Sequence, residues 1–224
     1  MASEIIPISY GVNCFLIKTG SGFFLIDTGV ANKRLALEKE LERQGCRPGE
    51  LKLVILTHGD SDHADNAAYL REKYGAKIAI HPEDAGMVEH GDMSWKRKPK
   101  PDKVAFFFRL ITLVFSGPVK FDTFKPDILL EDGQDLSPYG LEAHVLHLPG
   151  HSKGSIGVLT ASGDLFAGDL LSNFFKPGYH FIDDLVDWNN SMEKLKEMEI
   201  KTVYPGHGKA FSMKRLLNNL NTAT

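Results

Sequence analysis

The chain has 224 residues, of which 42% are hydrophobic and 25% are charged, values typical of a globular protein with a sizeable core. Its net charge of -3 argues against a nucleic-acid-binding protein, which usually carries a surplus of positive charge. Two cysteines, Cys14 and Cys46, are too few for a disulfide framework, and the N-terminal residues show no secretory signal, so a cytoplasmic location is expected.

The first third of the chain alternates strand and helix patterns. A hairpin signal, Thr19-Gly20-Ser21-Gly22, joins the first two predicted strands. Apolar spacing predicts helices that end at Gly45 and Gly75, because glycine commonly terminates a helix. The predicted elements are strands at 12–18 and 23–27, a helix at 32–44, a strand at 51–56, a helix at 64–74 and a strand at 77–80.

The alternation of strand and helix patterns stops between residues 83 and 125, and regular elements resume after it. The later predicted elements are strands at 128–130, 141–148, 155–160 and 164–167, a helix at 191–198, a strand at 201–204 and a helix at 211–220. Strands in two groups, with helices between and after them, predict two sheets covered by helices in one domain that spans residues 1–224.

The irregular segment 83–125 is predicted to be a lid over the site, because long departures from regular structure inside a domain are usually functional. Its run 104–119 contains Arg109 and is shorter than the roughly 20 apolar residues of a membrane span. Four aromatic side chains are predicted to form an apolar wall of the site: Phe106, Phe107, Phe108 and Phe115. A basic cluster precedes them and either attracts an anionic substrate or is merely solvated: Lys96, Arg97, Lys98, Lys100 and Lys103.

Possible metal ligands gather in loops that follow predicted strands. His58, Asp60, Asp62 and His63 come directly after the strand at 51–56. Three further candidates follow later strands: His151, Asp169 and His207. Histidine and aspartate are common ligands of divalent metals, and seven of them exceed what one ion needs. The pattern therefore predicts two adjacent metal ions.

These motifs resemble the metal signature of the metallo-β-lactamase-fold hydrolases, H-x-H-x-D-H followed by a distant histidine, an aspartate and a last histidine. The resemblance covers nearly the whole chain, in the order of the following segments: Leu25-Ile26-Asp27-Thr28-Gly29, residues 58–63, Pro149-Gly150-His151-Ser152, Ala167-Gly168-Asp169 and Pro205-Gly206-His207-Gly208. It implies an α/β fold built as a four-layer αββα sandwich and the activity of a metal-dependent hydrolase.

The resemblance also assigns ligands to the two metals. His58, Asp60 and His151 would bind the first ion, and the second would be bound by Asp62, His63 and His207. Asp169 would bridge the two ions. Asp62 and Asp169 are the candidate catalytic carboxylates, since they offset the positive charge of two divalent ions. Zinc is the expected metal.

Asp60 departs from the family pattern, which has histidine at this position. A carboxylate is a harder ligand than imidazole and adds negative charge, so it favours iron or manganese. On this argument Asp60→His should produce a more zinc-like site. The alternative is that Asp60 binds no metal and only stabilises a turn in the Gly-Asp-Ser loop.

The predicted reaction is hydrolysis of a small ester-type substrate, which is a thioester, a lactone or a phosphoester, by a hydroxide that bridges the metals. No G-x-S-x-G motif offers a serine nucleophile. One alternative is an iron-dependent persulfide dioxygenase that uses His58, His151 and Asp169; another is a metal-binding protein without activity. The expected partner is a small molecule, with no nucleic acid and no stable membrane insertion, and a homodimer is left open.

The other polar residues are expected to have structural roles, or their roles are left open by the sequence. Asp27 is expected to hold loops by hydrogen bonds rather than to bind metal. His144 and His147 point to opposite faces of one strand and cannot serve the same metal. His81 is a candidate partner of the ligands. Three residues near the ligand loops are candidates for substrate contact or simply exposed: Lys153, Tyr179 and His180.

Overall fold

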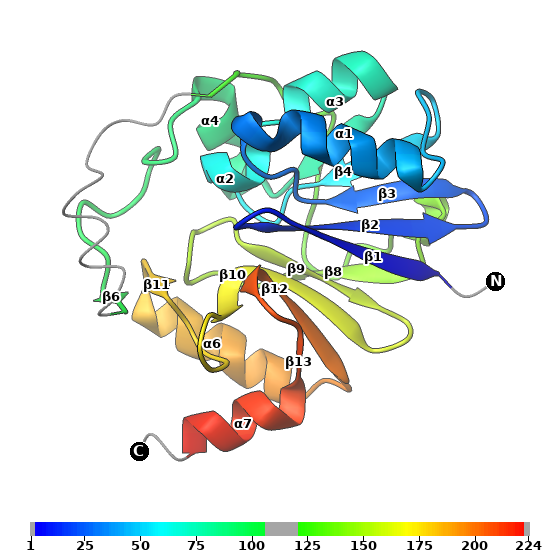
Figure 1. Ribbon diagram of the computed structural model, residues 1–224. Coiled ribbons are helices and arrows are strands. Elements are labelled where there is room, and N and C mark those ends of the chain that lie inside the picture. The colour runs from blue at the N-terminus through cyan, green and yellow to red at the C-terminus, as the bar shows by residue number, and fades with distance from the viewer. Residues whose placement is uncertain (1–2, 106–120, 222–224) are drawn as a thin grey trace.

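The computed structural model describes residues 3–105 and 121–221 of the chain. Figure 1 shows two β-sheets stacked face to face, with helices on both outer faces. This is the predicted four-layer αββα sandwich, and the predicted fold class is confirmed.

The first sheet has six strands in the order β1-β2-β3-β4-β5-β7. β1, β2 and β3 pair antiparallel, whereas β3, β4, β5 and β7 pair parallel. The strands are β1 (Glu4–Ser9), β2 (Asn13–Thr19), β3 (Gly22–Ile26), β4 (Leu51–Ile55), β5 (Lys77–Ile80) and β7 (Ile128–Leu129).

The second sheet has five strands in the order β13-β12-β10-β9-β8. β10 and β12 pair parallel, and the other neighbours pair antiparallel. The strands are β8 (Ala143–His147), β9 (Ile156–Thr160), β10 (Asp164–Asn173), β12 (Thr202–Gly208) and β13 (Phe211–Ser212). A small separate pair joins β6 (Lys103–Val104) to β11 (Phe181–Ile182).

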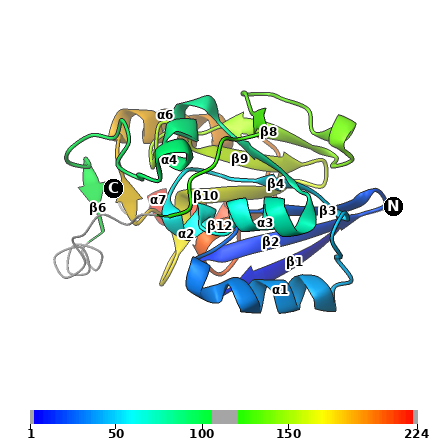
Figure 2. The same cartoon turned by 90° about the horizontal axis from the view of Figure 1, so that it is seen from above.

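Helices cover the outer face of each sheet (Figures 1 and 2). The helices beside the first sheet are α1 (Arg34–Arg43), α2 (Ser61–Ala64), α3 (Ala67–Tyr74) and α4 (Pro82–His90), and those beside the second are α6 (Leu185–Lys196) and α7 (Met213–Asn221). Short 3-10 turns lie at Ala31–Lys33 and Ser137–Tyr139.

Three apolar clusters fill the spaces between the four layers. The first joins the outer face of the first sheet to α1 and α3, through residues such as Leu41 and Leu70. The second lies between the sheets, where Phe15, Phe24 and Phe166 are buried. The third packs the second sheet against α6 and α7. Because strands such as β4 are covered on both faces, they appear in the sequence as continuous apolar runs.

The structure differs from the predicted elements in several places: α2, β6, β11 and β13 were not predicted, and β10 extends to Asn173 instead of ending at residue 167. β1 was not predicted, although it pairs with β2 over its whole length. α4 occupies the start of the segment predicted to be irregular; Pro82 lies in its first turn and the His81 side chain accepts a hydrogen bond from the Glu83 amide. α6 begins at Leu185 instead of residue 191, because the Asp184 carboxylate caps it.

The predicted apolar wall of Phe106, Phe107, Phe108 and Phe115 lies outside the described residues. Among the residues that are described, no helix has the length and apolar character required to cross a membrane.

Candidate metal centre

One end of the sandwich collects the loops that carry the predicted ligands. β3 and β4 run parallel, so Asp27 and His58 leave the same edge of the first sheet. In the second sheet, the parallel pairing of β10 with β12 places Gly168 opposite Pro205, which brings Asp169 and His207 together. The fold therefore converts ligands that are scattered in the sequence into one cluster.

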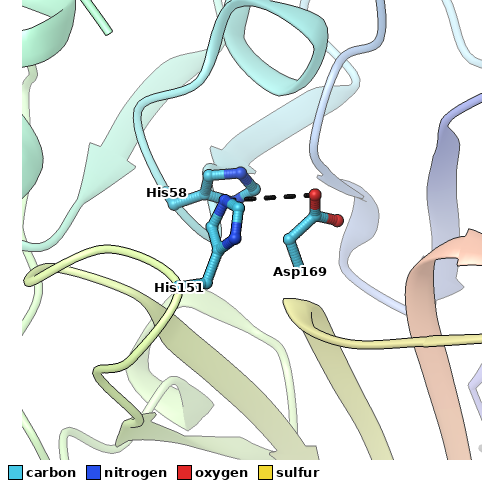
Figure 3. A group of neighbouring side chains, drawn as sticks. All are labelled: His58, His151 and Asp169. Atoms are coloured by element: carbon cyan, nitrogen blue, oxygen red, sulfur yellow. Dashed lines mark ion pairs between the residues drawn. The ribbon is translucent and has the colours of Figure 1, made fainter. Parts of the chain in front are cut away.

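The predicted ligands meet around Asp169. Its Oδ1 lies 3.3 Å from His63 Nε2, and its Oδ2 lies 3.3 Å from His207 Nε2 and 4.0 Å from His151 Nε2. Figure 3 shows His58 and His151 facing Asp169. Side chains with ligand atoms within 4.8 Å of one another form three groups among the described residues: His58, His151 and Asp169; Asp62, His63 and His207; and Asp169, His180 and His207.

Each of the four predicted histidine ligands is held by a hydrogen bond from its Nδ1, which leaves Nε2 facing the cluster. The acceptors are Thr57 Oγ1 for His58 (3.0 Å), Asp27 Oδ2 for His63 (2.8 Å), the Phe181 carbonyl for His151 (3.3 Å) and the Gly11 carbonyl for His207 (2.9 Å). Such bonds fix the tautomer and the ring orientation that a metal requires.

Asp27 lies behind the ligands and organises two of them. Its carboxylate accepts hydrogen bonds from the Thr57 amide and hydroxyl, both at 2.8 Å, in addition to the bond from His63. Asp27 has a φ of 57°, a left-handed conformation that is unusual for a residue other than glycine. This backbone strain sits at a position that fixes His63 directly and His58 through Thr57.

Gly206 shows how closely the chain approaches the cluster. A Cβ at this position would collide with Asp169 Oδ1 and would lie 2.8 Å from His63 Cε1. The Pro205-Gly206-His207 motif therefore needs glycine so that β12 can pass directly beside the Asp169 carboxylate.

The donor set fits divalent metal ions. His58 Nε2, His63 Nε2 and Asp169 Oδ1 are buried and lack a hydrogen-bond partner within the described part of the chain. Burying such groups without a hydrogen bond is costly, and two metal ions, one at His58 and one at His63, with Asp169 between them, would satisfy all three. The cluster therefore has both the chemistry and the unmet bonding capacity of a metal site.

The pKa values of the clustered side chains are set by burial and by their ionic contacts with one another. Burial lowers the pKa of His207, but Asp169 and Asp62 raise it to about 10. Burial raises the pKa of Asp169, yet the surrounding imidazoles hold it well below its usual value. Because a metal binds only the neutral imidazole, metal binding at His207 must release a proton.

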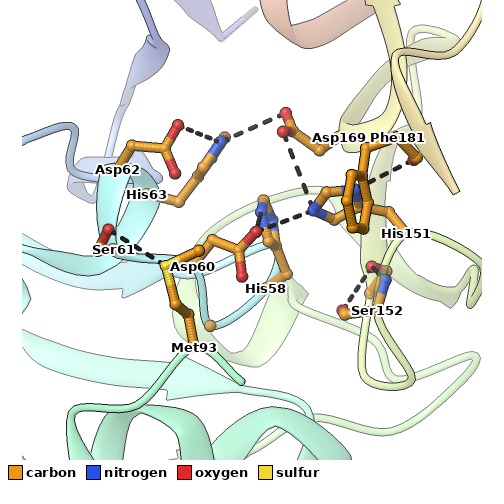
Figure 4. A network of polar contacts seen from close by, with 12 residues as sticks. His58, Asp60, Ser61, Asp62, His63, Met93, His151, Ser152, Asp169 and Phe181 are labelled. Atoms are coloured by element: carbon orange, nitrogen blue, oxygen red, sulfur yellow. Dashed lines mark hydrogen bonds and ion pairs between the residues drawn. The ribbon is translucent and has the colours of Figure 1, made fainter. Parts of the chain in front are cut away.

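Asp60 lies between the predicted histidine ligands and a buried arginine. It occupies the position before α2, but its side chain makes no capping hydrogen bond, so turn chemistry does not account for it. Its Oδ2 lies 3.1 Å from His151 Nε2 and 3.6 Å from His58 Nε2. Burial raises the pKa of Asp60, but Arg97 and His151 hold it far below its ordinary value. Figure 4 shows the carboxylate directed toward the two imidazoles.

Two residues that organise the site were not identified as such from sequence. Arg97 pairs with Asp60, although the sequence placed it in a cluster thought to be solvated or substrate-attracting. Asp84 is buried and ties two ligand loops together, because it accepts hydrogen bonds from the Gly59 amide (3.1 Å), the Ser152 hydroxyl (2.6 Å) and the Gly154 amide (2.8 Å). No local signal marks Asp84, since an acid in the first turn of a helix is usually explained by the helix dipole.

The remaining candidates fall into two groups. His180 Nε2 lies 3.1 Å from Asp169 Oδ2 and thus belongs to the cluster. His81 instead stacks on His147, with ring centroids 4.1 Å apart, and His144 lies in an exposed position on β8. Lys153 is also exposed.

A largely apolar hollow of about 260 Å³ adjoins the cluster at His180. Phe174 forms part of its wall and stacks on His207, with ring centroids 5.5 Å apart. The other lining residues are Ala105, Ser172, Phe175, Lys176 and Tyr179. The hollow therefore borders the cluster at His180 and His207.

Comparison with known proteins agrees with this geometry. The sequence pattern of the family described as the Metallo-beta-lactamase superfamily matches residues 9–207. The chain belongs to the metallo-β-lactamase superfamily.

Its relatives in this superfamily include named hydrolases. It is 28% identical to a "Probable metallo-hydrolase" of Methanocaldococcus jannaschii over 92% of this chain and 95% of that protein. It is 26% identical to an acyl-coenzyme A thioesterase of Gallus gallus over 91% of this chain and 75% of that protein. A crystal structure of a protein in a di-iron-bound form is similar as well, with a TM-score of 0.68, 25% identity and coverage of 95% of this chain and 96% of that one. The chain is a metal-dependent hydrolase, and the predictions of family and enzyme class are confirmed.

Proposed function

We propose that the protein hydrolyses a small thioester, using two divalent metal ions held by the cluster around Asp169. The observation that supports this most strongly is the position of Asp169, which groups with His58 and His151 and also lies 3.3 Å from both His63 Nε2 and His207 Nε2. When bound, two divalent ions polarise a substrate carbonyl and lower the pKa of a water molecule, so that hydroxide is available at neutral pH.

Some residues of the chain would bind the metals, and others would hold those ligands in position. His58, His151 and Asp60 would hold the first ion, Asp62, His63 and His207 the second, and Asp169 would bridge them. Asp27 would keep the His63 and His58 rings in place, because both depend on its hydrogen bonds directly or through Thr57. Such preorganised ligands lose little freedom when the substrate reacts.

The hollow beside His180 supports a thioester over a phosphoester. Its lining is mainly apolar and aromatic and suits an acyl group, while Lys176 offers one cation for a distant anionic group of the thiol portion. The similarity to an acyl-coenzyme A thioesterase supports the same substrate class.

An activity panel with defined metal content tests this proposal. Protein reconstituted with zinc, iron or manganese would be assayed on an acyl-coenzyme A thioester, a lactone and a phosphodiester. The proposal expects the highest kcat/KM on the thioester, and it expects Phe174→Ala to raise KM for longer acyl chains more than for acetyl. Preference for the lactone or the phosphodiester would contradict the thioester assignment.

A second candidate function rests on the group of His58, His151 and Asp169 alone. Two histidines and one carboxylate form the facial triad of non-haem iron oxygenases, so one iron ion and molecular oxygen would suffice for a persulfide dioxygenase. This reaction would consume oxygen and survive His207→Ala, whereas thioester hydrolysis would proceed under nitrogen and fail in that variant.

A further inference from the structure

The Asp60 carboxylate is bound on two sides. Arg97 Nη2 lies 3.0 Å from Oδ1, and Nη1 donates a hydrogen bond to Oδ2 at 3.2 Å. The opposite side of Oδ2 faces His151 and His58. The side chains of Asp60 and Arg97 are only 9% and 11% exposed, so water does little to screen this pair.

Arg97 is held in place by the same elements that hold His151. Its guanidinium lies 5.9 Å from the Phe181 ring centroid and donates a long hydrogen bond, 3.5 Å, to the His151 carbonyl. The Phe181 carbonyl in turn accepts the hydrogen bond from His151 Nδ1. The next residue toward the N-terminus, Lys96, has a φ of 56°, a strained conformation at the point where the segment turns toward the site.

The formal charges explain why an arginine belongs there. Asp60, Asp62 and Asp169 would place three carboxylates on the two metals, one more than in the family motif with histidine at position 60. A buried arginine paired with Asp60 cancels this additional charge. A buried ion pair is stable only when both partners are present, since removing one leaves an uncompensated charge.

We infer that Asp60 and Arg97 act as one charge-neutral unit that replaces the neutral histidine of the family motif, with Asp60 as the ligand of the first metal and Arg97 as its positioning and compensating residue. This inference rests on the metal centre of the proposed function. Arg97 is a determinant of metal affinity, and Asp60→His alone does not produce a normal site, because it leaves the arginine cation beside the metal.

The test is a double-mutant cycle of Asp60→His, Arg97→Met and the combined variant, with zinc affinity and metal content measured on the full-length protein without substrate. Asp60→His should weaken binding of the first ion by about ten- to a hundred-fold. The combined variant should recover most of that loss, because it again pairs a neutral ligand with a neutral neighbour. Lys98→Met removes a positive charge from the same segment but pairs with Asp102 and Asp184, so it should leave zinc affinity unchanged.

The apo protein gives a second readout in the presence of chelator. Asp60→His and Arg97→Met should each lower thermal stability, and the combined variant should lose less than the two effects added together. Arg97→Gln serves in place of Arg97→Met if the latter does not fold. The inference is overturned if Arg97→Met changes zinc affinity by the same factor in the protein with Asp60 as in the Asp60→His variant. Zinc affinity is measured without substrate, so this result would not bear on thioester hydrolysis, which the activity panel tests separately.

Discussion

The two halves of the metal centre differ in their access to solvent. His58, Asp60 and His151 are buried, and Arg97 covers them from the segment that follows α4. In the other half His63 is buried as well, but the Asp62 side chain is 38% exposed and that of His207 13%, and the apolar hollow opens nearby. The closed half is suited to hold an ion firmly, whereas the open half is suited to exchange ligands and to receive a substrate.

The shared residue should matter most, because neither half is complete without Asp169. We expect Asp169→Ala to reduce the metal content at both positions and to lower thioester hydrolysis by about a thousand-fold or more, since the metals activate the attacking water. Metal analysis and steady-state kinetics would measure this. Asp164→Ala, at the other end of β10, is the matched control and should keep both metals.

The difference in exposure predicts unequal release of the two ions. When the loaded protein is mixed with excess chelator, the ion of the open half should leave at least about ten times faster than that of the closed half, because water reaches two of its ligands, Asp62 and His207. His207→Ala should abolish the fast phase, and His151→Ala should abolish the slow one. Release of both ions in one phase from the wild type would contradict the distinction.

Asp27 links the two halves through Thr57 and His63. Asp27→Ala should weaken binding of the second ion by about ten- to a hundred-fold, because the His63 ring loses the acceptor that orients it. Titration with zinc would measure the affinity. Asp27→Asn keeps an acceptor oxygen and should have a smaller effect; equal losses in both variants would argue against an orienting role.

A smaller effect is expected on the free energy of unfolding, through His81, which is not one of the proposed metal ligands. Burial and the neighbouring His147 lower the pKa of His81 to about 4 from 6.5. The unfolded chain therefore binds a proton at higher pH than the folded chain, so the contribution of His81 to stability is present above pH 6.5 and is lost as the pH falls toward 4, by at most about 1.4 kcal/mol per pH unit.

The measurement is chemical denaturation of chelated protein between pH 4 and 7. His81→Asn should flatten the pH dependence, while asparagine can still cap α4. His144→Asn, at an exposed position, is the control. An unchanged slope in His81→Asn would show that another group governs stability in this range.

The sequence was sufficient to predict the two sheets, most strands and most of the residues that surround Asp169, because apolar runs and loop ligands are local patterns. The role of His180, which also contacts Asp169, could not be decided from sequence. It did not indicate Arg97 or Asp84, since their roles depend on contacts with Asp60 and Gly59 that are distant in the sequence. α4 was missed because its short apolar face, Ala85, Met87 and Val88, lies beside a proline- and lysine-rich stretch that suggested a loop. In both cases long-range packing, which one sequence does not display, decided the structure.

The most direct test of the account is the number of metal ions per chain together with thioester hydrolysis under nitrogen, for the wild type beside His207→Ala. We predict two ions and hydrolysis in the wild type, and one ion with hydrolysis reduced at least about a hundred-fold in the variant. One ion in the wild type, with an oxygen-dependent activity that His207→Ala retains, would contradict the two-metal hydrolase and support the mononuclear alternative.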